Sequence, residues 1–467
     1  MRLLKIFITI VLLFTLTSCT ATYALNPKLE MKVRLDPLQG KLLSPNKSDD
    51  LFLILSFSGG GTRAAALSYG ILEALEKIEI PPPAKSVSTK DNSHVRHTLY
   101  DEIDLITGVS GGSFTAGYFG LHGKDAFRDF REKVLVKNLQ TDLIHMVLNP
   151  VNLIRLGSPR FGRSEVAQEY YDKMIFHGAT LGDIAGGKGP AVNILATDAD
   201  DGIIFPFIPS QFALICSDFE KFPLARAVAA SAAFPGAFSP IILKNYAGDC
   251  AYKGPFWLAD ALAKPDPTSR VYNTALMTKT YLNQEEKPYI HLIDGGVSDN
   301  LGIRNIMESI AAMGGILEVM KKQQITSGRQ LVFIIVDAQT QDTKHWRMMD
   351  EIPGLGAILG ASSTIMINKY NFETIDLLRR YCEEWKQELE KAGNRNIEIY
   401  IVHVSFDALP EKEEREYFQS VKTALALPED QVDKLRSVAG KILFAQKPFV
   451  KLVKDLGGKI TENKQER

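Results

Sequence analysis

Apolar runs recur along the chain, and each is followed by glycine or by polar residues. Their length and their content of β-branched and aromatic residues predict strands that are buried on both faces, which is typical of a parallel sheet. The runs that we expect to form strands cover residues 51–58, 102–109, 190–200, 289–296, 330–339 and 397–406. Each run is long enough to cross the core of one domain.

Segments with helical periodicity lie between these runs. After the first strand and a glycine turn, Leu67, Ile71, Leu72 and Leu75 recur at helical spacing. Residues 111–122 predict a helix rich in small residues, and residues 222–236 predict a helix that is stopped by proline. Strands that alternate with helices indicate an α/β fold, in which a mostly parallel central sheet lies between two helical layers.

Several segments do not fit this alternation. Residues 81–98 and 251–288 are expected to be insertions, and residues 409–467 a charged, helical C-terminal extension. Residues 351–369 are apolar and rich in small residues, which is compatible with a helix packed in the core and also with a lid or a membrane-contacting element. Residues 50–408 then form the main domain.

The first residues have the pattern of an export signal, with two cations followed by an apolar run too short to span a bilayer. We assign residues 1–18 to a signal peptide. The sequence Leu16-Thr17-Ser18-Cys19 resembles the lipobox of bacterial lipoproteins, which makes Cys19 a lipid anchor, whereas a plain signal peptide would be cut elsewhere, near Ala24. Residues 19–49 are polar and aperiodic and predict a tether. Thr20 favours an outer-membrane location over retention at the inner membrane.

Composition narrows the possible functions. Without residues 1–18, which contain two of the 54 basic residues, 52 Lys and Arg face 55 Asp and Glu, so nucleic acid is not expected as a partner. Of the cysteines left after Cys19, Cys216 and Cys250 are the candidate disulfide pair in an exported protein. The scattered histidines do not predict a metal site; the acidic stretch 197–202 could bind calcium or be a solvated turn.

The sequence Gly108-Val109-Ser110-Gly111-Gly112 fits G-x-S-x-G, the nucleophile elbow of serine hydrolases. In this strained turn between a strand and a helix, only glycine lets the neighbouring backbone pass close to the serine. Ser110 is therefore the candidate nucleophile, and the next helix directs its positive end toward an oxyanion. An ordinary turn of small residues is the alternative.

A second glycine motif follows the first predicted strand, with Gly59, Gly60 and Gly61 preceding Arg63. Bare backbone N–H groups of this kind form a cradle for negative charge. The motif lacks the Gly-Lys-Ser/Thr ending of a P-loop, and no strand carries the acidic residue that a dinucleotide site needs about twenty positions later. An oxyanion hole that serves Ser110 is the remaining candidate.

A third motif, Asp294-Gly295-Gly296, ends an apolar run. A carboxylate at this position would be partly desolvated and within reach of the other strand ends, where ligand sites of α/β sheets gather. The alternative is an aspartate that only caps a turn.

Taken together and in this order, the three motifs resemble those of the patatin-like phospholipases, over residues 50–303. The resemblance implies a patatin-like fold and a serine acyl hydrolase that uses a Ser110-Asp294 dyad. The implied site residues are the nucleophile Ser110, the base Asp294, the oxyanion-hole residues Gly59, Gly60, Gly61 and Arg63, and the elbow residues Gly108 and Gly112. It implies no cofactor and no metal, and a phospholipid or another acyl ester as substrate. Membrane association through Cys19 is expected from the lipobox-like sequence. Ala64 departs from the usual glycine of the first motif, and the two insertions leave the shape of the entrance open.

Two alternatives to this function remain at the sequence level. A Ser-His-Asp esterase could use His403, which follows Asp294 in the chain and lies near a predicted strand end. The other nearby histidine, His291, precedes Asp294 by three residues. A lipid-binding or scaffold lipoprotein without catalysis is the other alternative, although the serine, the aspartate and the glycines are all present.

Overall fold

The computed structural model describes residues 25–30, 47–48, 50–83, 96–322, 330–340, 350–394 and 397–460. The predicted signal peptide, its Cys19 and most of the predicted tether lie outside the described residues, as do residues 84–95 of the first insertion.

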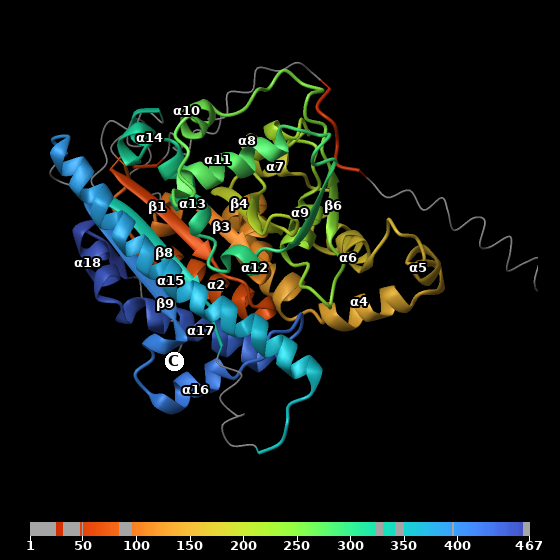
Figure 1. The fold of residues 1–467 in the computed structure, drawn as a ribbon. Coiled ribbons are helices and arrows are strands. Elements are labelled where there is room, and N and C mark those ends of the chain that lie inside the picture. The colour runs from red at the N-terminus through yellow and green to blue at the C-terminus, as the bar shows by residue number, and fades with distance from the viewer. Residues whose placement is uncertain are drawn as a thin grey trace, which may run out of the picture.

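A single mixed sheet of eight strands forms the centre of the described chain (Figure 1). The strands are β1 (Leu51–Phe57), β3 (Ile103–Val109), β4 (Ala191–Asp198), β5 (Ile203–Pro206), β6 (Ile241–Lys244), β7 (Tyr289–Asp294), β8 (Gln330–Asp337) and β9 (Glu398–Ser405). Their order is β6-β7-β4-β3-β1-β8-β9, and β5 pairs with β4. The run from β4 to β9 is parallel, whereas β5, β6 and β7 are added in antiparallel pairs. Each predicted strand is confirmed by one observed strand.

The sheet is buried on both faces because side chains of a strand alternate between two apolar layers. In β1, Leu53 and Leu55 belong to the larger core, while Ile54 belongs to a second core on the opposite face. In β8, Ile334 and Ile335 divide in the same way. This alternation within continuous apolar runs is the reason that the predicted three-layer α/β arrangement forms.

Helices cover both faces and the ends of the sheet (Figure 1). They are α2 (Gly61–Glu76), α3 (Gly111–His122), α4 (Leu139–Leu148), α5 (Pro150–Arg155), α6 (Arg163–Tyr171), α7 (Leu181–Ala185), α8 (Pro209–Leu214), α9 (Leu224–Ser231), α10 (Leu258–Leu262), α11 (Arg270–Tyr281), α12 (Gly296–Asp299), α13 (Arg304–Ala312), α14 (Ile316–Lys322), α15 (Leu355–Lys391), α16 (Lys412–Gln419), α17 (Glu429–Ala445) and α18 (Lys447–Asp455). A separate two-stranded antiparallel sheet pairs β2 (Ile78–Glu79) with β10 (Lys459–Ile460). Within the described chain, no helix combines the length and the apolar character that crossing a membrane requires.

The C-terminal helical region packs on the main core rather than beside it. Val432, Leu435 and Ile442 of α17 are buried in the same apolar cluster as α2. The two helices approach so closely at Gly70 that a Cβ atom there would lie 2.2 Å from the carbonyl oxygen of Arg436. Residues 409–460 are therefore structurally part of the α/β body.

The first described segment, residues 25–30, is bound to the body near β6. The side chain of Asn26 is buried, donates to Ser217 Oγ at 2.9 Å and accepts from the backbone N–H of Lys244 at 2.7 Å. Cys216 and Cys250, the candidate pair, form a disulfide beside this segment, and Leu29 packs against it. Six residues of the predicted tether are thus held on the folded domain.

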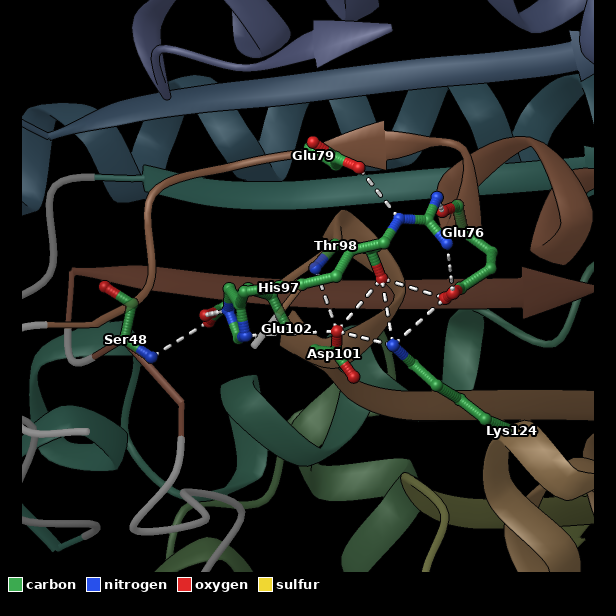
Figure 2. A network of polar contacts seen from close by, with 9 residues as sticks. Ser48, Glu76, Glu79, His97, Thr98, Asp101, Glu102 and Lys124 are labelled. Atoms are coloured by element: carbon green, nitrogen blue, oxygen red, sulfur yellow. Dashed lines mark hydrogen bonds and ion pairs between the residues drawn. The ribbon is translucent and has the colours of Figure 1, made fainter. Parts of the chain in front are cut away.

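A network of hydrogen bonds and ion pairs surrounds the C-terminal end of the first insertion, residues 81–98 (Figure 2). Asp101 caps the helical turn Leu99–Glu102 by accepting from the N–H of Thr98 at 2.8 Å, and Lys124 donates to Asp101 at 2.7 Å. Arg96 donates to the Glu79 carboxylate at 2.9 Å. The C-terminal end of the insertion is therefore held against β2 through Arg96, and Asp101 next to it is held by Lys124 in the turn that follows α3.

Candidate active site

Ser110 lies at the sharp turn between β3 and α3, as the nucleophile-elbow motif predicts. Its backbone has a positive φ of 49°, a strained conformation for a residue with a side chain. The flanking glycines are needed for space, because a Cβ atom at Gly111 would lie 2.0 Å from the carbonyl oxygen of Gly61, and one at Gly112 would lie 2.6 Å from that of Phe57. The serine turn and the glycine-triplet loop therefore touch backbone to backbone.

The Ser110 hydroxyl donates to Asp294 Oδ2 at 2.7 Å. These side chains come from strands that are not neighbours, since β4 lies between β3 and β7. The strand β7 runs antiparallel to β4, and its last residue, Asp294, pairs with Ala196. The last paired row of β3 and β4 joins Val109 to Leu195, so Ser110 and Asp294 flank β4 at the same level. We expected Asp294 at the common edge of the strand ends, and the antiparallel register is what brings it there.

The Asp294 carboxylate is buried, with 4% of the residue exposed. Its Oδ1 accepts from the backbone N–H of Gly296 at 2.8 Å, while Oδ2 faces Ser110. Burial raises the pKa of Asp294 from 3.8 to about 6, and the two hydrogen bonds oppose this rise. Near neutral pH the carboxylate is therefore ionised and weakly solvated.

The glycine-triplet loop is fixed by backbone contacts from distant parts of the chain. The N–H of Gly59 donates to the carbonyl of Asn300 at 3.1 Å, so Gly59, which we had assigned to the oxyanion hole, already has an acceptor. A Cβ atom at Gly61 would lie 2.3 Å from the carbonyl oxygen of Ala424, which also accepts from the N–H of Thr62 at 2.9 Å. Gly60 and Gly61 open α2, and N–H groups in the first turn of a helix have no intrahelical acceptor.

The side chain of Arg63 helps to hold this loop in place. Its buried guanidinium donates to the carbonyls of Ala338 at 2.8 Å and Val421 at 2.6 Å. A Cβ atom at Gly60 would lie 2.9 Å from Arg63 Nη2. These two contacts of Arg63 are with main-chain carbonyls, which indicates a positioning role in the loop.

Two residues of the site were not singled out from the sequence. Ser231, at the end of α9, accepts from the N–H of Ser110 at 2.9 Å and donates to the carbonyl of Leu195 at 2.6 Å. Asn300 places its side-chain oxygen 2.6 Å from where a Cβ atom of Gly59 would be. Both residues lie in or near segments noted in the sequence, Ser231 in the predicted helix 222–236 and Asn300 shortly after Asp294, but only the contacts in the folded chain assign them a role.

A cavity of about 1450 Å³ opens beside Ser110 and Asp294. Its walls are mainly apolar and come from α4, α15, the glycine loop and residues 416–425. A second cavity of about 1640 Å³ lies at the opposite edge of the sheet, where the parallel strands begin. Residues of the second insertion, such as Tyr252, Phe256 and Arg270, line this second cavity rather than the one beside Ser110.

The histidines considered as alternatives to Asp294 have other partners. His403 lies on β9, three strands from β3, and its Nε2 is 3.3 Å from Asp337 Oδ2. His291 Nδ1 is 3.2 Å from Asp200 Oδ2 at the surface. Neither histidine is hydrogen-bonded to Ser110 or Asp294 in the part of the chain that the structure describes.

The acidic stretch 197–202 forms ion pairs with a lysine of the same chain. Lys287 Nζ is 2.7 Å from Asp198 Oδ2 and also contacts Asp201, and the Tyr281 hydroxyl donates to Asp198 at 2.6 Å. Over the described residues, no group of three or more His, Cys, Asp or Glu side chains has the arrangement of a metal site.

The fold and the site define a mixed α/β protein with a mostly parallel sheet and a serine at a strand-to-helix turn. A family profile described as Patatin-like phospholipase matches residues 55–307, which is more than half of the chain. The chain therefore belongs to the patatin-like phospholipase family, which confirms the predicted fold and supports lipid acyl hydrolase activity.

Comparison with solved structures finds human GIVD cytosolic phospholipase A2, with a TM-score of 0.45 and 11% sequence identity over 88% of this chain and 62% of that one. The same human protein in complex with methyl gamma-linolenyl fluorophosphonate gives a TM-score of 0.37 and 12% identity over 92% of this chain and 61% of that one. The chain thus spans about three fifths of the length of these proteins. A search of curated protein sequences gave no significant match.

Proposed function

We propose that this protein is a serine hydrolase of lipid esters, similar to a phospholipase A, in which Ser110 is the nucleophile and Asp294 is the base. The observation that carries the proposal is the hydrogen bond of 2.7 Å from Ser110 Oγ to the buried Asp294 carboxylate, at the wall of a large apolar cavity. Membership of the patatin-like phospholipase family supports the substrate class.

In the proposed reaction, Asp294 Oδ2 takes the hydroxyl proton as Ser110 Oγ attacks the carbonyl carbon of the ester. The carbonyl oxygen becomes an oxyanion. When the tetrahedral intermediate collapses, the carbon–oxygen bond to the alcohol breaks and Asp294 gives its proton to the leaving alkoxide. Water then attacks the acyl-enzyme with Asp294 again as base, which releases the fatty acid and restores the serine. The raised pKa of Asp294, about 6, brings its basicity closer to what these proton transfers need.

Stabilisation of the oxyanion is assigned to the starts of two helices. The N–H groups of Gly60 and Gly61 lie at the start of α2, and that of Gly111 lies at the start of α3, so both helix dipoles favour negative charge there. A well-placed donor of this kind contributes about 3 to 4 kcal/mol to the transition state. Arg63 is proposed to hold the loop rather than to bind substrate, in keeping with its two carbonyl acceptors.

Fluorophosphonate labelling and hydrolysis of a soluble short-chain ester test this proposal on the purified full chain. We expect Ser110→Ala to abolish labelling, and both Ser110→Ala and Asp294→Asn to lower kcat/KM by about a thousandfold or more.

The control is His403→Ala, which removes the partner of Asp337 but no group of the proposed site. It should keep hydrolysis within about twofold, as is usual for a change away from the reacting atoms. Loss of activity in His403→Ala with retention in Asp294→Asn would identify a Ser-His-Asp esterase instead. Unlabelled Ser110 in folded protein would favour a scaffold function.

We also propose that the protein is an exported lipoprotein with Cys19 acylated, located at the outer membrane. The lipobox-like sequence before Cys19 and the disulfide between Cys216 and Cys250 support export, since disulfides persist in oxidising compartments. Metabolic labelling with an alkyne fatty acid tests the anchor, and Cys19→Ser should lose the label and leave the membrane fraction. A chain that partitions to membranes unlabelled would contradict it.

A further inference from the structure

Exposed apolar side chains gather on α4 and α5, which lie at one end of the molecule (Figure 1). The exposed residues there are Ile144, Leu148, Val151, Leu153 and Ile154, each with between 45% and 64% of its surface exposed. Single exposed apolar side chains are ordinary, but a group of them on neighbouring helical turns marks an interaction site.

Buried side chains and hydrogen bonds hold α4 and α5 in the position that exposes these residues. The inner face of α4 is anchored by the buried Leu139 and Leu143. Asn149 caps α5 by accepting from the N–H of Val151 at 3.0 Å, and the buried Asn152 donates to the carbonyl of Met146 at 2.9 Å. Because these hydrogen bonds fix the angle between the helices, the outward apolar face is a stable feature of the fold.

This surface is continuous with the cavity beside Ser110. Ile144 and Leu148 belong to both, since they line the cavity and are also exposed. Another part of the cavity wall comes from the first half of α15, where Ile365 and Met366 are exposed next to cavity-lining positions. Exposed apolar side chains of both α4 and α15 therefore adjoin the cavity, as they would where an acyl chain leaves a lipid layer.

The charges around this surface are mainly positive. Arg160 and Arg163 are exposed on the segment that follows α5, and Arg163 also donates to the carbonyl of Gly236 at 3.0 Å. Arg155 is paired with Glu169, and the one carboxylate of α4, Asp142, accepts from the Tyr170 hydroxyl. Cations beside an apolar helical face match the head groups of anionic phospholipids.

We propose that α4 and α5 insert their apolar face into a phospholipid surface, together with the exposed apolar side chains in the first half of α15, so that the ester passes from the lipid layer to Ser110. The proposal rests on the proposed function and assigns the entry side of the substrate. A lipid surface is favoured over a second copy of the chain because the patch is continuous with the cavity and is bordered by cations.

Insertion is measured directly with the full chain bound to vesicles of phosphatidylethanolamine and phosphatidylglycerol. A fluorophore is attached at Val151→Cys or, as control, at Val450→Cys, a residue of α18 with 53% exposure compared with 64% for Val151. The chain without an introduced cysteine gives the background label, since Cys382 is buried and Cys19 lies outside the described residues. Spin labels on the lipid acyl chains should quench the probe at 151 and leave the probe at 450 unquenched.

Hydrolysis gives the second readout. Val151→Glu should lower hydrolysis of vesicle phospholipid by about tenfold, because a charged side chain replaces one that is buried in lipid. Hydrolysis of a soluble short-chain ester should stay at the wild-type rate, since Val151 does not line the cavity. The matched Val450→Glu should change neither rate.

The outcomes separate this inference from the function on which it rests. Equal quenching at both positions, or equal phospholipid hydrolysis by Val151→Glu and Val450→Glu, would overturn the entry surface while ester hydrolysis stands. Quenching at 151 in a chain without any esterase activity would instead refute the catalytic proposal. A fluorescence change at 151 that needs no lipid and grows with protein concentration would identify a second copy as the occupant.

Discussion

The carboxylate of Asp294 has to be ionised to act as a base, yet only 4% of the residue is exposed. Burial raises its pKa to about 6, so the base is present above this pH and lost by protonation below it. We therefore expect kcat/KM for a soluble ester to rise with pH and level off above about pH 6, with about a tenfold loss per pH unit on the acid side. A flat profile between pH 4 and pH 8 would contradict this assignment.

The ionisation of Asp294 should change the stability of the fold in the opposite direction to activity: stability falls as the pH rises. Between the ordinary pKa of 3.8 and about 6, the folded chain retains a proton on Asp294 that the unfolded chain releases. Its contribution to folding is present at acid pH and is lost as the pH rises through about 6. Asp294→Asn should consequently unfold at a higher temperature than wild type at neutral pH, and calorimetry near pH 4 should find this difference reduced.

Ser231 provides a test of how the elbow is held. Ser231→Ala leaves the N–H of Ser110 and the carbonyl of Leu195 without their hydroxyl partner, which should cost about 1 to 3 kcal/mol and lower kcat more than it raises KM. Ser68 is the control, because it is also fully buried but its hydroxyl has no hydrogen-bond partner among the described residues. Ser68→Ala should be nearly neutral in both chemical denaturation and ester hydrolysis.

At the scale of elements, the contact between α2 and α17 depends on one glycine. Gly70→Ala would place a methyl group 2.2 Å from the Arg436 carbonyl oxygen, so the helices must separate, at a cost of about 1 to 3 kcal/mol. Gly440 lies on the same pair of helices, but a methyl group there would find its nearest atom at 3.8 Å. Gly440→Ala should stabilise the protein by up to about 1 kcal/mol, because alanine is the better helix former. Opposite shifts in urea midpoint would confirm the difference.

Local patterns explain why the strands and the three glycine motifs could be predicted. A strand that is buried on both faces is apolar throughout, and a turn that passes close to another backbone needs glycine, so both leave a signal in a few consecutive residues. The direction of β7 leaves no such signal, since an apolar run reads the same in a parallel and an antiparallel strand. The roles of Ser231 and Ala424 depend on contacts with residues far away in the sequence, such as Ser110 and Gly61.

The sequence also did not determine which parts of the long helix α15 are buried. Its first half was compatible with core packing or with membrane contact, and its described side chains are divided accordingly. Ala361 is buried, whereas Ile365, Met366 and Phe372 are exposed, and Leu378 and Trp385 further along are buried in the second core. Composition shows that such a segment is apolar, but only its position in the fold shows which part of the helix has a neighbour.

For the whole molecule, the structure predicts that the matched region, residues 55–307, is not sufficient for a folded enzyme. The strands β8 and β9 follow that region, and Val421 and Ala424 hold the glycine loop. A chain that stops after residue 408 should be insoluble or should fail to react with a fluorophosphonate. A chain that stops after residue 460 keeps every contact described above and should label like wild type, whereas equal labelling of both would contradict this prediction.

The late position of Ala424 in the chain determines when the glycine loop can form during translocation. A chain that crosses a membrane from its N-terminus delivers Ser110 and Asp294 long before residue 424 of its 467 residues. Until that late carbonyl arrives, Gly61 and Thr62 lack the partner that shapes their loop. If the chain is an exported lipid hydrolase, as proposed above, it would remain inactive until translocation is nearly complete, and the membrane that it crosses would not be hydrolysed.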